Sequence, residues 1–271
     1  ALAGNDSIHG SEFDDTLNGG AGDDLMKGAG GDDTLSGGEG IDTVFFDFAL
    51  TDATLEVLAN GYAITGTQGR DVLIGIERFV FTDGTVALDD GAPLVDDLFY
   101  YMRNPDVWLA GASAEEHYLS SGAAEGRDPN AWFSTVVYNT ANPDVVAAGM
   151  NPLEHYISSG WAEGRVISAN FNPSAYLAEH GEVNYDALEH FLTEGQALGY
   201  APIPLESLVI GGVDWSFYYA NNPDVVMSGL NPNAHYASSG WSEGRDPNAW
   251  FDSDGYMAAY GALVGDANPL E

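Results

Sequence analysis

The chain has 271 residues, of which 42 are Asp or Glu and only 7 are Lys or Arg, so its formal net charge is −35. So few bases exclude nucleic-acid binding through a basic surface and electrostatic docking onto anionic lipid. No apolar run predicts a transmembrane segment. The absence of Cys excludes disulfides and thiolate metal sites. The chain starts at Ala1 without a signal-like segment, which indicates a part of a longer protein.

Residues 1–45 divide into five consecutive nonapeptides, which read ALAGNDSIH, GSEFDDTLN, GGAGDDLMK, GAGGDDTLS and GGEGIDTVF. Most first, second and fourth positions are Gly. Position six is always Asp, at Asp6, Asp15, Asp24, Asp33 and Asp42. Position eight is always apolar, at Ile8, Leu17, Met26, Leu35 and Val44. A disordered Gly/Asp-rich linker is the alternative, but linkers do not keep Asp and an aliphatic residue in a nine-residue register.

The composition of each nonapeptide predicts a turn followed by a short strand. A Gly-rich turn can expose backbone carbonyls, because Gly adopts positive φ without strain. One Asp adds a carboxylate, so each turn offers only hard oxygen ligands, which suit Ca²⁺. The next three residues predict a strand whose middle side chain points inward. Two nonapeptides would then complete one coil of a parallel β-roll.

These nonapeptides resemble the RTX family (repeats-in-toxin, the hemolysin-type calcium-binding repeat), whose motif is GGxGxDxUx with U large and apolar. The resemblance implies that each ion lies between two turns eighteen residues apart. One turn would give its Asp and the carbonyls of positions one and three, and the other its Asp and the carbonyls of positions two and four. Ser11 and Phe13 depart from the motif, but their positions would serve a turn upstream of Ala1.

The resemblance therefore implies about three calcium ions. The first site would combine Ala1, Ala3 and Asp6 with Gly20, Gly22 and Asp24. The second would combine Gly10, Glu12 and Asp15 with Ala29, Gly31 and Asp33. The third would combine Gly19, Ala21 and Asp24 with Gly38, Gly40 and Asp42. The first site is the least secure because it uses the chain terminus.

Residues 46–94 are predicted to cap the roll. Alternating apolar and polar residues around Asn60-Gly61 predict a β-hairpin. A remnant half-repeat, Gly69–Leu73, follows, and two more strand-like runs meet at Asp83-Gly84. A closing hairpin would cover backbone groups that an open end of the roll leaves unpaired. Residues 1–94 are therefore expected to form one all-β domain.

A second period begins near residue 95. Successive tyrosines lie 38, 38, 42 and 38 residues apart, at Tyr100, Tyr138, Tyr176, Tyr218 and Tyr256. Each unit carries two helical signals, one ending near an Asn-Pro and one that begins, for example, at Asn151-Pro152 and ends at Gly160. The pattern predicts an α-helical tandem-repeat domain over residues 95–271. It would have five units of about 38 residues, the last truncated, with a linker near residues 201–212.

Three residue sets in these units are candidates for chemistry. Arginines and aspartates recur in register, as Arg127, Arg165 and Arg245 with Asp106, Asp144 and Asp224. We expect structural ion pairs from them rather than anionic-glycan sites, because the surroundings are acidic. The His-aromatic pairs lack metal-ligand spacing and predict hydrogen bonding. Trp161 and Trp241 share one repeat position and are candidate platforms for sugar rings, although core packing is the commoner role.

No nucleophile–base arrangement stands out, so we expect no catalysis from this part of the protein. The family resemblance implies an extracellular bacterial protein exported by type I secretion, with calcium-coupled folding outside the cell. One hypothesis is a non-catalytic module whose helical units bind surface, matrix or polysaccharide partners in adhesion. The alternative is the C-terminal secretion and folding module of an extracellular hydrolase or protease whose catalytic domain lies upstream.

Overall fold

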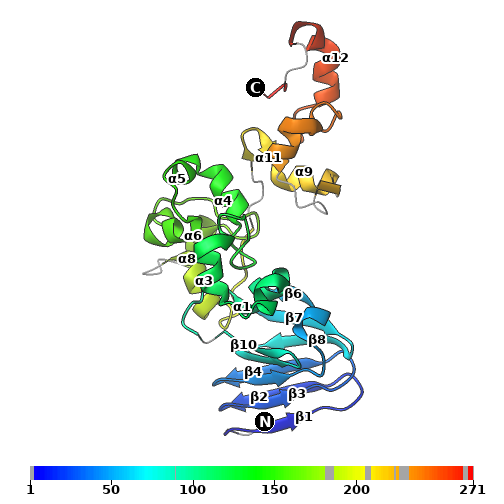
Figure 1. Ribbon diagram of the computed structural model, residues 1–271, viewed down its shortest axis with the longest axis vertical. Helices are drawn as coiled ribbons and strands as arrows, with labels where there is room; N and C mark the ends of the chain where they lie inside the picture. Colours follow the sequence, from blue (N-terminus) through cyan, green and yellow to red (C-terminus); the bar gives the residue numbers. More distant parts are fainter. Residues whose placement is uncertain are drawn as a thin grey trace.

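The computed structural model describes residues 3–88, 90–180, 186–204, 209–222, 224–225, 232–264 and 268–270. Strands occupy the N-terminal part and most helices follow, as expected from the two repeat patterns. Figure 1 shows an elongated molecule, with β1 at one end and α12 near the other.

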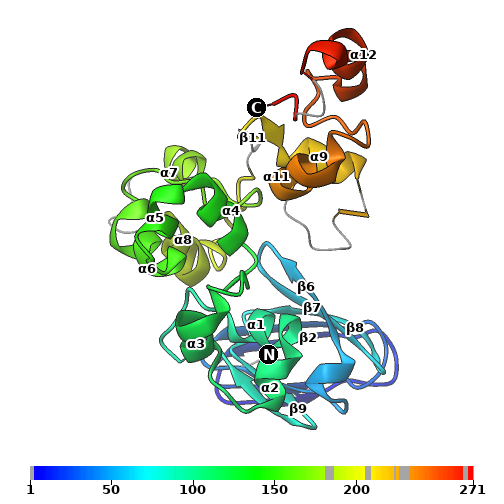
Figure 2. The same cartoon turned by 45° about the horizontal axis from the view of Figure 1, so that its top comes forward.

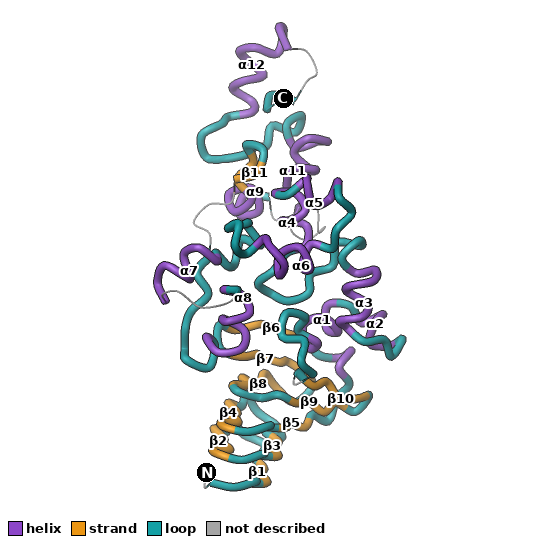
Figure 3. The backbone as a smooth tube through the Cα atoms, turned by 90° about the vertical axis from the view of Figure 1, so that its left-hand side faces the viewer, coloured by secondary structure: helices purple, strands orange, loops and turns teal. Residues whose placement is uncertain are grey.

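The last three residues of each nonapeptide form or begin a strand. These strands are β1 (Ser7–His9), β2 (Thr16–Ala21), β3 (Leu25–Lys27), β4 (Thr34–Glu39) and β5 (Thr43–Phe45). Odd-numbered and even-numbered strands enter two different sheets, in which neighbours are parallel. Ile8 pairs with Met26, and Leu17 pairs with Leu35. Each nonapeptide therefore stacks on the nonapeptide after the next one, as the tube in Figure 3 shows.

The apolar residue at position eight fills the space between the two sheets. Met26, Leu35 and Val44 are at most 1 % exposed, whereas Ile8 is only partly buried at the end of the stack. Burying one such side chain contributes about 1.5–3 kcal/mol relative to leaving it exposed. The core of this part is thus a thin column of single side chains.

The cap continues both sheets before it closes them. Its elements are η1 (Leu50–Asp52), β6 (Thr54–Leu58), β7 (Gly61–Gly66), β8 (Gly69–Ile74), β9 (Arg78–Phe81) and β10 (Gly84–Ala87). β8 adds to β4 and β9 adds to β5, both in parallel. The hairpins β6–β7 and β9–β10 then close the two sheets with antiparallel pairs.

Both expected hairpins form, but each turn lies one residue earlier than expected. Leu58 pairs with Gly61, so Ala59 and Asn60 make the first turn. Phe81 pairs with Gly84, so the second turn is made by residues 82 and 83. In both hairpins the Gly is the first residue of the second strand, with φ of 152° and 159°.

The helical part contains more helices than the expected two per unit. The first two units hold α1 (Asp97–Arg103), α2 (Pro105–Leu109), α3 (Ala114–His117) and η2 (Tyr118–Gly122), then α4 (Thr135–Ala141), α5 (Pro143–Ala147), α6 (Pro152–His155) and η3 (Tyr156–Gly160). The third holds α7 (Pro173–His180), α8 (Ala187–His190) and η4 (Phe191–Gly195). The remainder holds β11 (Val209–Ile210), β12 (Val213–Asp214), α9 (Trp215–Asn221), α11 (Pro232–His235), η5 (Tyr236–Gly240) and α12 (Ser253–Val264).

The additional helices α2 and α5 start at the Pro of an Asn-Pro pair. Pro lacks an N–H and has a fixed φ, which suits the first helical position. The sequence predicted only a helix end near each Asn-Pro. That interpretation was incomplete, because Asn104 and Asn142 each cap the end of one helix and the start of the next. Part of the expected linker over residues 201–212 is also ordered, since β11 pairs with β12.

A continuous cluster of buried side chains joins the strands to the first helices. It runs from Met26 through the cap to Leu98 and Tyr100 of α1, and on to Phe191. α1 packs against β6 and β10. The change in composition near residue 95 is thus a change of secondary structure without a break in the packing. Val213 of β12 and Trp215 and Tyr218 of α9 belong to a second cluster, and Figure 2 shows α9 beyond the group from α4 to α8.

A Tyr–His–Gly contact recurs in the helical units. In the second unit the Tyr138 hydroxyl forms a hydrogen bond of 2.7 Å with Nδ1 of His155. The same hydroxyl lies directly against Gly160, the last residue of the π-helical turn η3. A Cβ at residue 160 would collide with this oxygen, so only Gly permits the approach. Matching hydrogen bonds join Tyr100 to His117, Tyr176 to His190 and Tyr218 to His235.

This contact predicts a non-additive pair of substitutions. Gly160→Ala should lower the free energy of unfolding by about 1–3 kcal/mol, because the new methyl group overpacks the Tyr138 hydroxyl. Tyr138→Phe should cost about 1–2 kcal/mol, since it leaves the His155 ring nitrogen unpaired. In the double variant the methyl group has room, because the Tyr138 ring carbon Cζ lies 3.4 Å from its position. The free energy of unfolding should therefore fall less in the double variant than the sum of its decreases in the two single variants.

Urea unfolding of the full chain in calcium would measure these three free energies. Gly261→Ala is the matched control, because Gly261 is helical and a Cβ there meets only Cε of Met257 at 3.6 Å. It should leave stability unchanged or raise it, since Ala favours the helix. Additive losses from Gly160→Ala and Tyr138→Phe would contradict the contact.

Candidate calcium sites

The Asp at position six of each nonapeptide connects two stacked turns. Its Oδ1 accepts a hydrogen bond from the backbone N–H of the Asp that lies 18 residues earlier. Asp24 accepts from Asp6 at 2.7 Å, and Asp42 accepts from Asp24 at 2.8 Å. Asp33 accepts from Asp15 at 2.8 Å on the other side of the stack. Two columns of carboxylates therefore run along the turns.

The second oxygen of these carboxylates has no partner. Oδ2 of Asp24, Asp33 and Asp42 is buried and makes no hydrogen bond, and the three residues are at most 1 % exposed. A buried carboxylate oxygen without a hydrogen bond or a cation carries a large desolvation cost. Burial also raises the pKa of Asp42, and the nearby charges of Asp24 and Asp23 raise it further. A cation beside these oxygens would offset that cost.

The glycines keep space open around each unpartnered oxygen. A Cβ on Gly19 would collide with Oδ2 of Asp24, and a Cβ on Gly28 would collide with Oδ2 of Asp33. The carbonyl oxygen of Gly37 belongs to the next turn on the same side of the stack. It lies 2.6 Å from the position that a Cβ on Gly19 would occupy. Carboxylate and carbonyl oxygens thus converge there, which is the ligand type that Ca²⁺ binds.

Side chains alone would not make such a site. Within the residues that the structure describes, no three His, Asp or Glu side chains gather as a metal-binding group. Backbone carbonyls as the remaining ligands stay a prediction from the sequence. Two observations show that the residues present fit a calcium ion. Carboxylate oxygens are buried without a partner, and glycines leave space beside them.

A second ladder, which sequence reasoning missed, runs through position five. The side chain there accepts a hydrogen bond from the backbone N–H at position five of the next turn on the same side. Asp23 accepts from Ile41 at 3.0 Å, and Asp14 accepts from Asp32 at 2.9 Å. Asn5 does the same for Asp23 at 3.0 Å. The repeated Asp-Asp pairs could have revealed this ladder. The first Asp of a pair accepts a hydrogen bond from the later turn, and the second accepts one from the earlier turn.

The expected carbonyl ligands at positions two and four have unusual backbone angles. Positive φ occurs at Gly20, Gly22, Gly31, Gly38 and Gly40 and, alone among the described non-Gly residues, at Ala29 with φ of 80°. The carbonyl of Ala21 accepts the N–H of Gly4 at 2.6 Å, which uses one of its two lone pairs. Ala3, Gly10 and Glu12 are described, whereas Ala1 lies outside the described residues. Their coordination of an ion remains a prediction.

The second expected site differs from the others at Ser11. The N–H and the hydroxyl of Ser11 donate to Oδ2 of Asp15 at 2.6 and 2.9 Å. These hydrogen bonds lower the pKa of Asp15. We expected Ser11 to leave the internal sites unaffected, but it occupies the oxygen that is unpartnered in Asp24. Phe13, the other departure from the motif, is 78 % exposed.

The candidates in the helical units have structural partners. Arg165 donates to both carboxylate oxygens of Asp144 at 3.1 and 2.9 Å, and also to Asn142. Arg127 and Asp106, and Arg245 and Asp224, repeat this geometry. The expected structural ion pairs are therefore present, and the histidines pair with tyrosines as described above. Trp161 and Trp241 are half-buried and pack against the two hydrophobic clusters.

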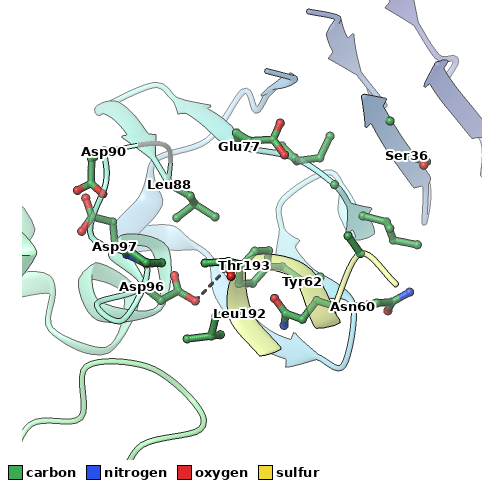
Figure 4. Close-up of a pocket in the computed structure, with 18 of the residues that line it drawn as sticks. Ser36, Asn60, Tyr62, Glu77, Leu88, Asp90, Asp96, Asp97, Leu192 and Thr193 are labelled. Atoms are coloured by element: carbon green, nitrogen blue, oxygen red, sulfur yellow. Dashed lines mark hydrogen bonds between the residues drawn. The ribbon is translucent and has the colours of Figure 1, made fainter. Parts of the chain in front are cut away.

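A separate cavity of about 580 Å³ lies between the cap and the helical units. Figure 4 shows Asp90, Asp96 and Asp97 at one end, with the Tyr62 hydroxyl donating to Asp96 at 2.9 Å. Burial raises the pKa of Asp97 to about 7, and the charges of Asp90 and Asp96 add to this effect. The cavity shares no carboxylate with the expected calcium sites.

Two solved structures are similar to parts of this chain. The extracellular lipase LipA from Serratia marcescens matches with 28 % sequence identity and a TM-score of 0.27, over 28 % of this chain and 12 % of its own. The AlgE6R3 subunit of the Azotobacter vinelandii mannuronan C5-epimerase matches with 20 % identity and a TM-score of 0.15, over 33 % and 82 % of the two chains. The chain therefore covers only a small part of the lipase. No curated protein matches its sequence.

The family comparison concerns the same residues as the carboxylate columns. The family model of the RTX calcium-binding nonapeptide repeat (4 copies) matches residues 1–35 and again residues 9–44. None of the described helices has the length and apolar character needed to cross a membrane. Residues 1–44 of this chain are RTX calcium-binding nonapeptide repeats.

Proposed function

We propose that this chain is an extracellular module whose folding depends on calcium. In this proposal residues 1–94 form a parallel β-roll with its cap, and residues 95–271 form tandem helical units that serve as a non-catalytic contact surface. The observation that carries it is the set of buried, unpartnered oxygens on Asp24, Asp33 and Asp42. The matching repeats occur in secreted bacterial proteins, and the lipase that resembles part of the chain is extracellular.

The mechanism is a coupling between metal binding and folding. Where calcium is scarce, the stacked carboxylates repel one another and the Gly-rich turns retain a large chain entropy. The roll then stays open, which suits export as an unfolded chain by type I secretion. Outside the cell, sites with Kd of roughly 10⁻⁴–10⁻³ M would fill and fold it. About three ions would occupy the three sites expected within residues 1–45.

The helical units would present a fixed surface to extracellular polysaccharide or to a surface protein. Their buried tyrosine–histidine bonds and bidentate Arg–Asp pairs hold the helices in a defined arrangement, which lowers the entropy lost on binding. Trp250 is 95 % exposed, and Trp161 and Trp241 keep part of their rings accessible. Exposed aromatic rings are suited to stacking on sugars. The alternative, a secretion module of an upstream hydrolase or protease, has no separate support from the geometry of this chain.

Removing calcium tests the folding mechanism. The full chain in excess chelator should lose β signal in far-UV circular dichroism, and about 10 mM Ca²⁺ should restore it, because that concentration exceeds the expected Kd. Each site filled at a hundred times its Kd adds about 2.7 kcal/mol to stability. Mg²⁺ should not substitute, since it demands octahedral geometry. An unchanged spectrum would sink the mechanism.

Charge removal at single positions tests the ligand assignment. Asp24→Asn keeps the Oδ1 acceptor but removes charge from two expected sites, so the apparent calcium affinity should fall roughly tenfold or more, about 1.4 kcal/mol. Asp6→Asn should cost less, because Asp6 belongs to one site. Asp23→Asn is the matched control, since it removes the same charge at position five and keeps the bond to Ile41. Equal losses in isothermal titration for Asp23→Asn and Asp24→Asn would indicate a net-charge effect instead.

A glycan array and a cell-surface pull-down with the calcium-loaded full chain test the contact surface. We expect binding to an extracellular polymer, and a fall of roughly tenfold or more when Trp161→Ala and Trp241→Ala are combined, because stacked aromatic rings dominate such contacts. Trp132→Ala is the control, since the partly buried Trp132 ring packs edge-on against the buried Phe191. Binding to no surface polymer would contradict this role.

A further inference from the structure

One cap segment repeats the later part of the N-terminal turns. Residues 66–71 read GTQGRD, with Gly at positions one and four and Asp71 at position six. Its strand, β8, pairs in parallel with β4, so that Leu73 lies beside Leu35. From sequence alone, only the fragment Gly69–Leu73 was recognised. The structure extends the match to residues 68–74, displaced along the chain by residues 46–65, whereas Gly66 pairs with Gly69 in the β7–β8 hairpin and lies against the Phe48 ring.

The hydrogen bonds of this turn match those of the family repeats. Oδ1 of Asp71 accepts the N–H of Asp33 at 3.1 Å, although the two residues are 38 apart in sequence. The position-five ladder also continues, because the N–H of Arg70 donates to Asp32 at 2.8 Å. Gly31 donates its N–H to the carbonyl of Gln68 at 3.0 Å, as Gly22 does to Glu39 at 2.7 Å. Gly69 has a φ of 141°, like the other glycines at position four.

The unpartnered oxygen of Asp33 lies against Gly28 of its own turn, and the cap turn is the next turn on that side of the stack. Asp24, Asp33 and Asp42 all use Oδ1 toward the earlier turn and hold Oδ2 against the first Gly of their own turn. At Asp24 the carbonyl of Gly37, from the later turn, lies beside that oxygen. The later turn for Asp33 is Gly66–Asp71. None of the three sites expected within residues 1–45 supplies a cation on that side.

We propose a fourth calcium site between the turn Gly28–Asp33 and the cap turn Gly66–Asp71. Its acids would be Asp33, through Oδ2, and Asp71, which is 6 % exposed. The register assigns it the carbonyls of positions one and three of the first turn and of positions two and four of the second. This site rests on the proposed function and lies beyond the residues that the family model matches.

The site joins segments that the other sites leave unconnected. An ion between Asp33 and Asp71 ties the cap strand β8 to the repeat strand β4. The next step along the stack, from Asp42 to Glu77, has only the short segment Gly75–Glu77 in place of a six-residue turn. That segment lacks the positions that would supply two of the carbonyls, so the proposal ends at Asp71.

Native mass spectrometry of the full chain at saturating calcium tests the site by counting ions. Asp71→Asn keeps an acceptor for the N–H of Asp33 and removes the charge, and it should bind one ion fewer than the wild type. Asp32→Asn is the matched control, because it removes the same charge from the adjacent exposed ladder and keeps the bond to Arg70. It should bind the wild-type number. Equal numbers for the two variants would overturn the proposal.

A crystal structure of the wild-type chain grown with calcium gives a second readout that needs no variant to fold. We expect an anomalous peak between the carboxylates of Asp33 and Asp71. A peak between Asp24 and Asp42 without one between Asp33 and Asp71 would overturn the fourth site and leave the proposed function intact. The absence of peaks at both places would remove the proposed function as well.

Discussion

A carboxylate shared between two stacked turns is the constraint on which the N-terminal part depends. Oδ1 of Asp24 holds the backbone of the earlier turn at 2.7 Å, while Oδ2 is buried against Gly19. The same residue thus provides both the backbone contact and the unmet charge. The strands themselves offer little else, because their core is one aliphatic side chain wide. In the proposed mechanism, a cation between the turns would satisfy the charge and bring the hydrophobic column into contact in one step.

This constraint accounts for only part of the acidity of the chain. Three Ca²⁺ ions would return +6 to a formal charge of −35. Many other carboxylates have structural uses of a different kind, such as Asp23 in the position-five ladder and Asp144 beneath Arg165. An excess of exposed acids of one sign favours solubility.

The sequence was sufficient to predict the elements that repeat strictly. The nine-residue register located the strands and the inward residues Met26, Leu35 and Val44, because period and burial have the same cause in a stacked coil. It could not reveal that Ser11 occupies Oδ2 of Asp15, since this bond depends on a local side-chain geometry. The cap turn was recognised only in part, because Thr67 differs from the motif and the register is established by the pairing of β8 with β4.

In the helical units, the sequence spacing was sufficient to predict the Arg–Asp ion pairs but not the π-helical turns. Arg165 and Asp144 recur in register, and the predicted ion pair is present. The π-helical turn that ends at Gly160 was not predicted, because its cause is the approach of the Tyr138 hydroxyl from another helix. A single-sequence pattern carries no information about such a contact until the helices are placed. The start of α5 at Pro143 was missed for a simpler reason, since the pair Asn142-Pro143 was read only as the end of a helix.

The displaced cap turn has a consequence for how such stacks can grow. Closing a loop of 38 residues instead of 18 costs only about 0.6 kcal/mol more in chain entropy, because the cost rises with the logarithm of loop length. The hairpin β6–β7 therefore interrupts the repeats at a small penalty, which its own packing can offset. A turn can join the stack wherever its strand pairs with a strand of the stack. The number of residues between the two turns changes the chain entropy only slightly. Repeats of this kind can thus be spread over a chain by insertions and still assemble into one continuous stack.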